Sequence, residues 1–318
     1  MKQIVIYRIC VLLLVVGSMQ AQSKLDSLFL QKLNPGTEFV EGKAYLFETT
    51  LYGKSMLVKA ENDPEFNMRG ELINGEPYAY FGNKPLVFKG TKQDKVKIGE
   101  KEFLCLIIQF TCDGKKYNAY ETQYANPRVC AYYDLIEADF LNEIRGLLVG
   151  KTLYTRSARW WKYNEDKINS NHKYTKAPEE SCKYCPVVIT RIYNDYDEKF
   201  VVLFRKDGGN EEYCFNNVLF DSQKIGRSLS FDRYFTFENP QNNYPEISQE
   251  RWGQIMNQKV RQGFTAEEVK VAYGEPDEKF TEDDDETWIY HNNNGSDYAI
   301  SFKENVVDKV RSQTTNYY

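Results

Sequence analysis

The clearest hydrophobic pattern in the chain lies between Gly263 and Phe302. Apolar residues recur there at helical spacing, which predicts a short helix over 265–273. Thr265 and Glu268 stand three residues apart, the spacing of a capping box in which each side chain bonds the backbone of the other. This stretch therefore predicts both a helix and the residue at which it begins.

Beyond Gly274 and Pro276, which predict the end of that helix, the pattern changes to a period of two. Alternating apolar residues predict three strands, carried by Trp288 and Tyr290, by Tyr298, Ile300 and Phe302, and by Val306 to Val310. An earlier helix is expected after the cap residue Ser248, with Trp252, Ile255, Met256 and Val260 on one stripe. We therefore expect two helices on one face of a three-stranded antiparallel sheet.

This order of motifs resembles the SmpA/OmlA (BamE-like) domain. The resemblance rests on Gly-Phe-Thr-x-Glu-Glu-Val from Gly263, on Gly-x-Pro from Gly274 and on Trp-x-Tyr from Trp288. It implies a small α+β module of the kind found in lipoproteins that assist outer-membrane assembly. The matching residues are helix caps and core positions, so they imply a fold more than a function.

Short alternating apolar runs separated by Gly, Asn and Asp turns fill the first two-thirds of the chain and predict β structure. The expected strands are 44–49, 55–59, several short pieces in 78–88, 103–111, 117–120, 152–155, 187–193, 200–204 and 212–215. A helix is expected at 134–148, and a polar loop at 162–181. The overall fold class is therefore α+β.

Two regions of this β structure share a layout. Gly42-Lys43 opens the first and Gly150-Lys151 the second, and each then runs through a polar loop, an apolar strand, a Gly turn and an aromatic strand. This repetition predicts two related modules, which are similar to bacterial SH3-like barrels. The expected segments are a signal peptide at 1–21, a β-rich module at 22–133, a helix plus β-rich module at 134–221, a linker at 222–247 and the BamE-like domain at 248–318.

The first residues predict export. Lys2 and Arg8 come before an apolar run at 11–16, and small residues lead to a cleavage site after Ala21. Removing 1–21 deletes two basic residues and no acid, so the formal charge falls from −5 to −7. That balance argues against nucleic-acid binding. No transmembrane segment is expected after cleavage.

Six cysteines follow the predicted cleavage site, and export permits disulfides among them. Cys182 and Cys185 form a Cys-x-x-Cys pair that could be a redox dithiol, although it precedes a strand instead of starting a helix. With His172 and Cys214 the pair could also hold zinc. We expect structural disulfides or buried thiols, and no cofactor.

Trp160, Trp161 and Tyr163 form an unusual aromatic cluster. Such side chains stack on sugars or peptides, so we treat them as binding candidates, with core packing expected for at least one tryptophan. An acidic run at 282–286 lacks the spacing of a calcium loop and is expected to be a solvated hairpin tip. His291 is expected at the surface.

These observations predict a non-enzymatic, exported cell-envelope protein that binds or assembles envelope components. The expected partners are envelope proteins or cell-wall components, and the expected location is periplasmic or secreted, peripheral at the outer membrane. The alternative is an extracytoplasmic enzyme, either a thiol oxidoreductase at Cys182/Cys185 or a hydrolase. The expected role in assembly rests on the resemblance to the BamE-like domain, which is an argument from fold alone.

Overall fold

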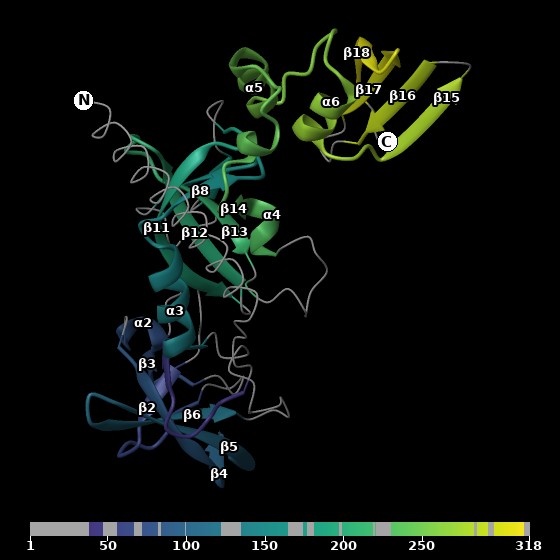
Figure 1. Ribbon diagram of the computed structural model, residues 1–318. Helices are drawn as coiled ribbons and strands as arrows, with labels where there is room; N and C mark the ends of the chain where they lie inside the picture. Colours follow the sequence, from purple (N-terminus) through teal and green to yellow (C-terminus); the bar gives the residue numbers. More distant parts are fainter. Residues whose placement is uncertain are drawn as a thin grey trace, which may run out of the picture.

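The structure is a computed structural model, and it is mainly β with few helices (Figure 1). It describes residues 38–46, 56–66, 72–81, 84–98, 100–121, 135–164, 174–176, 181–196, 199–218, 220, 230–282, 285–291 and 296–314. The expected signal peptide, His172 and Cys130 lie outside these residues. Within them, no helix is long and apolar enough to cross a bilayer.

The first sheet has seven antiparallel strands in the order β3-β2-β6-β5-β4-β1-β7. Its strands are β1 (Ala44–Leu46), β2 (Met56–Lys59), β3 (Glu76–Pro77), β4 (Leu86–Ile98), β5 (Lys101–Cys112), β6 (Lys115–Glu121) and β7 (Ile136–Glu137), with the short helix α2 (Tyr78–Phe81) after β3. Aromatic residues dominate its core, where Phe39, Phe88 and Phe110 pack ring to ring. The aromatic alternation in the sequence thus supplies the inner face of this sheet.

The second sheet also has seven antiparallel strands, in the order β10-β9-β13-β12-β11-β8-β14. Its strands are β8 (Thr152–Thr155), β9 (Trp161–Tyr163), β10 (Tyr174–Lys176), β11 (Pro186–Tyr196), β12 (Lys199–Lys206), β13 (Tyr213–Val218) and β14 (Phe235–Thr236). β12 is buried on both faces: Phe200, Val202 and Phe204 belong to one apolar cluster, and Val201 and Leu203 to another. The strands expected at 187–193, 200–204 and 212–215 are present in this sheet.

The two large sheets have one topology, because each strand number of the first becomes that of the second when seven is added. Local geometry repeats as well. The Gly42 N–H donates to Phe88 O at 2.9 Å and the Gly150 N–H to Ile189 O at 2.8 Å, and both glycines have φ of 83°. A register irregularity follows Phe88 and another follows Ile189. The predicted repetition of the two β regions is therefore present in strand order and in turn geometry.

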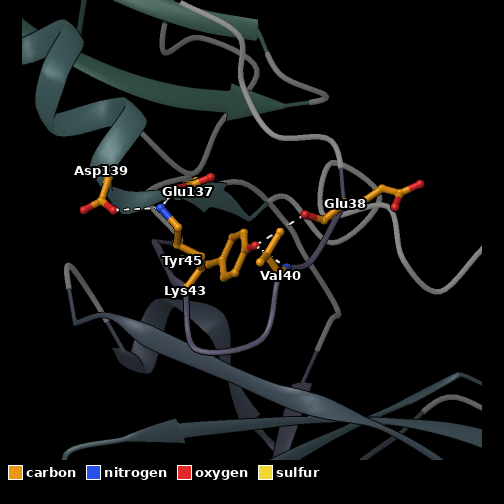
Figure 2. A network of polar contacts seen from close by, with 6 residues as sticks. All are labelled: Glu38, Val40, Lys43, Tyr45, Glu137 and Asp139. Carbon is orange, nitrogen blue, oxygen red and sulfur yellow. Dashed lines mark hydrogen bonds and ion pairs between the residues drawn. The ribbon is translucent and has the colours of Figure 1, made fainter.

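Helix α3 (Ala138–Leu148) connects the two sheets and buries Phe140, Leu141 and Ile144. Lys43 links the first sheet to the start of α3. Its ammonium lies 2.6 Å from Glu137 Oε1 and 3.1 Å from Asp139 Oδ2 (Figure 2). Their hydrogen bonds and charges raise the pKa of Lys43. The helix expected at 134–148 is confirmed, with β7 preceding it.

Residues 230–243, inside the expected linker, contain regular structure. α4 (Phe231–Tyr234) leads into β14, which pairs with β8, and the 3-10 helix η3 (Pro240–Asn243) follows. Phe231 stacks on Phe220 and on Phe235 at centroid distances of 5.3 and 5.1 Å. The second β unit therefore extends to Thr236, because its core needs these aromatic rings.

Residues 248–314 form the C-terminal unit, in which two helices precede a four-stranded antiparallel sheet. The elements are α5 (Gln249–Met256), α6 (Ala266–Tyr273), β15 (Glu278–Glu282), β16 (Asp285–Tyr290), β17 (Ser296–Lys303) and β18 (Val306–Thr314). Both predicted caps form: Ser248 accepts from the Arg251 N–H, and Thr265 and Glu268 make the reciprocal capping box.

The expected three-stranded sheet is corrected to four strands by β15. Its sequence, Glu-Lys-Phe-Thr-Glu, carries one apolar residue, so periodicity did not reveal it. β15 is an edge strand that pairs with β16, and the edge position tolerates its charges. The acidic run at 282–286 spans the end of β15 and the start of β16, with 283–284 outside the described residues.

We expect Gly42→Ala and Gly150→Ala to destabilise the protein by similar amounts, about 1–2 kcal/mol each. Both glycines have φ of 83°, and an added Cβ at either would meet nothing within 4 Å, so the cost is conformational strain alone. Urea unfolding of the two variants, followed by far-ultraviolet circular dichroism, measures it. Gly146→Ala is the control, because Gly146 has a helical φ and equal space. A strongly unequal loss at positions 42 and 150 would contradict the repeated geometry.

Candidate functional site

Cys182 and Cys185 form a disulfide that closes a four-residue turn before β11, with the two Cα atoms 5.8 Å apart. Both cysteines are buried, at 7% and 5% exposure, in the core cluster of the second sheet. The sequence left structural disulfides and buried thiols open as alternatives, and this pair is a disulfide. A redox dithiol exposes its attacking sulfur at a helix start, whereas these sulfurs lie under a turn.

Thr155, the last residue of β8, holds this turn on the side of the sheet. Its hydroxyl donates to Cys182 O at 2.8 Å and accepts from the Cys185 N–H at 3.2 Å. Its backbone N–H donates to Cys185 O at 3.1 Å, and its carbonyl accepts from the N–H of Tyr184. Thr155 is fully buried, so these bonds are shielded from water and hold the turn against the strand.

Lys183 holds the turn on the opposite side, where it contacts the C-terminal unit. Its backbone N–H donates to Met256 O at 2.9 Å, at the end of α5. Its ammonium donates to Val271 O at 2.7 Å and Ala272 O at 3.1 Å, in the last turn of α6. Carbonyls at a helix C-terminus lack helical partners and carry partial negative charge, so a cation is stabilised there.

Tyr184 adds an aromatic contact to the same helices. Its ring stacks on Trp252 of α5, with centroids 5.6 Å apart and planes 17° apart, and its hydroxyl donates to Val271 O at 3.2 Å. The residue has φ of 59°, a left-handed conformation uncommon for a bulky side chain. The surrounding bonds therefore determine the backbone of the turn.

Burial shifts the pKa of both side chains. It lowers the pKa of the Lys183 ammonium to about 8, and the charge of Arg156 acts in the same direction. It raises the pKa of the Tyr184 phenol to about 12, with a further contribution from Tyr244. At neutral pH, Tyr184 is a neutral donor and Lys183 is a cation whose burial costs free energy that its two carbonyl partners partly offset.

The structure does not bring together the three cysteines that were considered as zinc ligands, all of which lie in the described part of the chain. Cys182 and Cys185 lie in one core cluster as a disulfide, and Cys214 lies in another with Val201 and Leu203. Across the described part of the chain, no three His, Cys, Asp or Glu residues are placed to hold a metal ion. His172 lies outside that part. Cys105 and Cys112 are buried in β5.

The aromatic candidates at 160–163 separate into core and surface. Trp160 is 1% exposed, with its indole N–H donating to Ser157 O at 2.8 Å and its ring edge-on to Phe204. Tyr163 is also buried, at 9%. Trp161 is 37% exposed on β9, so among the three it is the one available for contact with a partner.

The sheet of the C-terminal unit has one covered face and one open face. Trp288, Ile300 and Phe302 pack under α5 and α6. Side chains alternate along a strand, so their neighbours lie on the other face. By the strand register, this open face comprises Glu278, Phe280, Thr287, Ile289, His291, Asp297, Ala299, Ser301, Lys309 and Arg311. Phe280 is 54% exposed there.

One end of the open face carries a histidine between two acids. His291 Nε2 lies 3.3 Å from Glu278 Oε1, and His291 Nδ1 lies 3.3 Å from Asp297 Oδ1. The hydrogen bond to Glu278, followed by that to Asp297, raises the pKa of His291. The backbone N–H of His291 donates to Asp277. The expectation of a surface histidine is confirmed, since its side chain is 47% exposed.

No protein-family model, curated protein or solved structure matches this chain. The resemblance to the BamE-like domain therefore stays a prediction that rests on the quoted residues.

Sequence reasoning found the cysteine pair but missed Thr155, Lys183 and Tyr184. The spacing Cys-Lys-Tyr-Cys predicts a turn, and nothing in it indicates that the side chains of the middle residues bond Val271 of α6, 88 and 87 positions away. The one feature of the sequence that could have indicated these contacts is a lysine and a tyrosine between two cysteines. Once the turn is buried, the ammonium and the hydroxyl both need polar partners.

We expect wild-type protein to gain stability relative to Lys183→Met as pH rises from 8 to about 10.5. The folded pKa of Lys183 is lowered to about 8, so over this window the unfolded state binds the proton and the folded state does not. The gain is on the order of 3 kcal/mol. Urea titrations of both proteins at pH 7.5 and 10 measure it. Lys279→Met removes one ammonium group at a half-exposed lysine and is the control for that loss of charge.

We expect His291→Gln to cost more stability at pH 5.5 than at pH 8.5. The raised folded pKa of His291 means that its ion pairs stabilise fully below the unfolded pKa of about 6.5 and that this stabilisation is lost as pH rises through the folded pKa. Thermal unfolding of both proteins across this range is the measurement. A difference in melting temperature that does not vary with pH would show that the pairs do not form.

Proposed function

We propose that this protein is a non-enzymatic, exported cell-envelope protein that binds or assembles envelope proteins or cell-wall components, and that the open face of the C-terminal sheet makes the contact. The observation that carries the proposal is Phe280, which is 54% exposed on a sheet face opposite the helices. An exposed aromatic ring flanked by polar side chains is typical of an interaction site.

The composition of the open face supports a protein or peptide partner. Ile289 and Ala299 are its apolar residues on the central strands, where they lie beside each other, and Phe280 lies on the edge strand β15 beside Thr287. Lys309 and Arg311 are exposed on the edge strand β18, and Glu278 lies on the opposite edge. Opposite charges at the two edges would orient a partner across the face.

The finer fold assignments are part of the same proposal. The capping box at Thr265 and the order of two helices before an antiparallel sheet support a BamE-like domain, from which β15 is a departure. The curled, repeated sheets support two SH3-like modules. Export rests on the signal-peptide pattern at 1–21. Trp161 is a second contact candidate because it is exposed on β9.

A thiol oxidoreductase at Cys182/Cys185 has less support. Catalysis of exchange needs a thiolate that substrate can reach, in an electropositive site that lowers its pKa. Here both sulfurs are buried and the residues between them bind two helices. These contacts are better suited to fastening two parts of the protein together.

We expect Phe280→Ser to reduce partner recovery at least several-fold when the tagged, exported protein is cross-linked in cells and purified from the envelope fraction. Loss of this exposed ring removes apolar contact area that binding would bury. Quantitative mass spectrometry of the co-purified material gives the measurement.

Ile73→Ser is the matched control, because Ile73 is also 54% exposed and lies in the first β unit. It should leave recovery unchanged. Equal recovery with all three proteins would reject the open face as the contact surface. Recovery lost only in Trp161→Ala would move the site to β9.

A further inference from the structure

We propose that the Cys182–Cys185 disulfide is a site of thiol–disulfide exchange that controls docking of the C-terminal unit onto the second β unit, with a dithiol reductant as the reacting partner. The bond would act as a redox-sensitive clasp. This goes beyond a role in binding, since it concerns how the C-terminal unit is held in place.

The turn can hold the two units together because its outer and its middle residues contact different units. Backbone groups of Cys182 and Cys185 bond Thr155 of β8. The Tyr184 N–H also bonds Thr155, but the other contacts of the two middle residues are with the helices: Lys183 bonds Met256, Val271 and Ala272, and the Tyr184 ring stacks on Trp252. One four-residue segment thus makes hydrogen bonds to both units (the position of the units is shown in Figure 1).

The disulfide restricts this segment to the docked shape. Tyr184 must hold φ of 59° for its ring to lie on Trp252. With the bond closed, the turn has few other conformations available. With the bond open, docking must also order two cysteines and the residues between them, which costs conformational entropy.

The first β unit provides an internal comparison. Its strand β4 is the counterpart of β11, and the turn before β4 is closed by a hydrogen bond from the Lys84 N–H to Phe81 O at 2.9 Å. Phe81 is buried in the core at that turn, where the second unit has Cys182. The cysteine pair therefore occurs in the β unit that contacts the C-terminal helices, and the shared fold of the two β units does not require a disulfide at this turn.

The exchange step is balanced when a dithiol supplies two electrons. A thiolate of the reductant attacks one sulfur, the bond between Cys182 and Cys185 breaks, and a mixed disulfide forms. The second thiol of the reductant then displaces the protein sulfur. Each protein sulfur leaves as a thiolate and takes up one of the two protons that the dithiol releases, so the protein ends with two thiols and the reductant ends as a disulfide.

Docking and the bond protect each other. Cys182 and Cys185 are 7% and 5% exposed in the core of the second sheet, and the two residues between them are bound to the helices. Attack on either sulfur therefore requires that the turn open and release those contacts. The closed bond in turn favours docking. By linkage, the closed bond and the docked state stabilise each other by the same factor at equilibrium. The reduction rate also reports docking, because the turn must open before a sulfur is attacked.

The test compares the oxidised and reduced full-length mature protein by hydrogen exchange at the amides of α5 and α6 and by small-angle scattering. We expect dithiothreitol to raise exchange in both helices on the order of tenfold and to increase the radius of gyration. Reoxidation should reverse both changes. Equal exchange and an unchanged radius in the two states would overturn the proposal.

Two variants separate the clasp from a general effect of reductant. The double substitution Cys182→Ser/Cys185→Ser should exchange like the reduced protein and should not respond to dithiothreitol. A response of that variant to reductant would overturn the assignment, because it would come from other cysteines.

Tyr184→Gly tests the contact itself, since glycine keeps the positive φ and removes the ring. We expect the disulfide of this variant to be reduced several-fold faster than in the wild type, as followed by thiol labelling and mass spectrometry. An unchanged reduction rate would show that docking does not shield the bond.

Discussion

The hydrogen bonds of the turn at 182–185 join the second β unit to the C-terminal unit. Thr155 bonds the backbone of Cys182 and Cys185 on the side of the sheet, and Lys183 places a buried ammonium on the last carbonyls of α6. A buried cation is costly unless its donors are satisfied, so the end of α6 and the turn stabilise each other. The position of the C-terminal sheet, and of any surface it presents, depends on this contact.

The two β units share one fold but differ at this turn. Both sheets have the same strand order. In each, the glycine before the first strand donates its N–H to an equivalent strand, Gly42 to β4 and Gly150 to β11. The units differ where the chain continues. The hairpin β4–β5 is longer than β11–β12, with strands of 13 and 12 residues against 11 and 8. The second unit instead places a disulfide turn against helices. The same fold thus has a longer hairpin in the first unit and a disulfide turn against helices in the second.

The C-terminal unit combines a rigid core with an open sheet face. Its two helices begin at capped residues and cover a core in which Trp288 of β16 packs on Phe302 of β17, with ring centroids 4.5 Å apart. Because α5 and α6 cover one face, the other presents Phe280 among polar and charged neighbours. A surface of this kind suits recognition of another molecule, since a well-packed support lets a partner bind without reordering the sheet.

Local chemistry determined what the sequence alone could show. The caps at Ser248 and Thr265, the helix at 138–148, the glycine turns and most strands follow from interactions within a few residues, and they were predictable. Tertiary structure decided the rest. It added the edge strand β15, took Phe231 and Phe235 from an expected linker into a core, and buried Trp160 while leaving Trp161 exposed. It also brought Lys183 to α6. These outcomes depend on which distant surfaces meet, and hydrophobic periodicity carries no record of that.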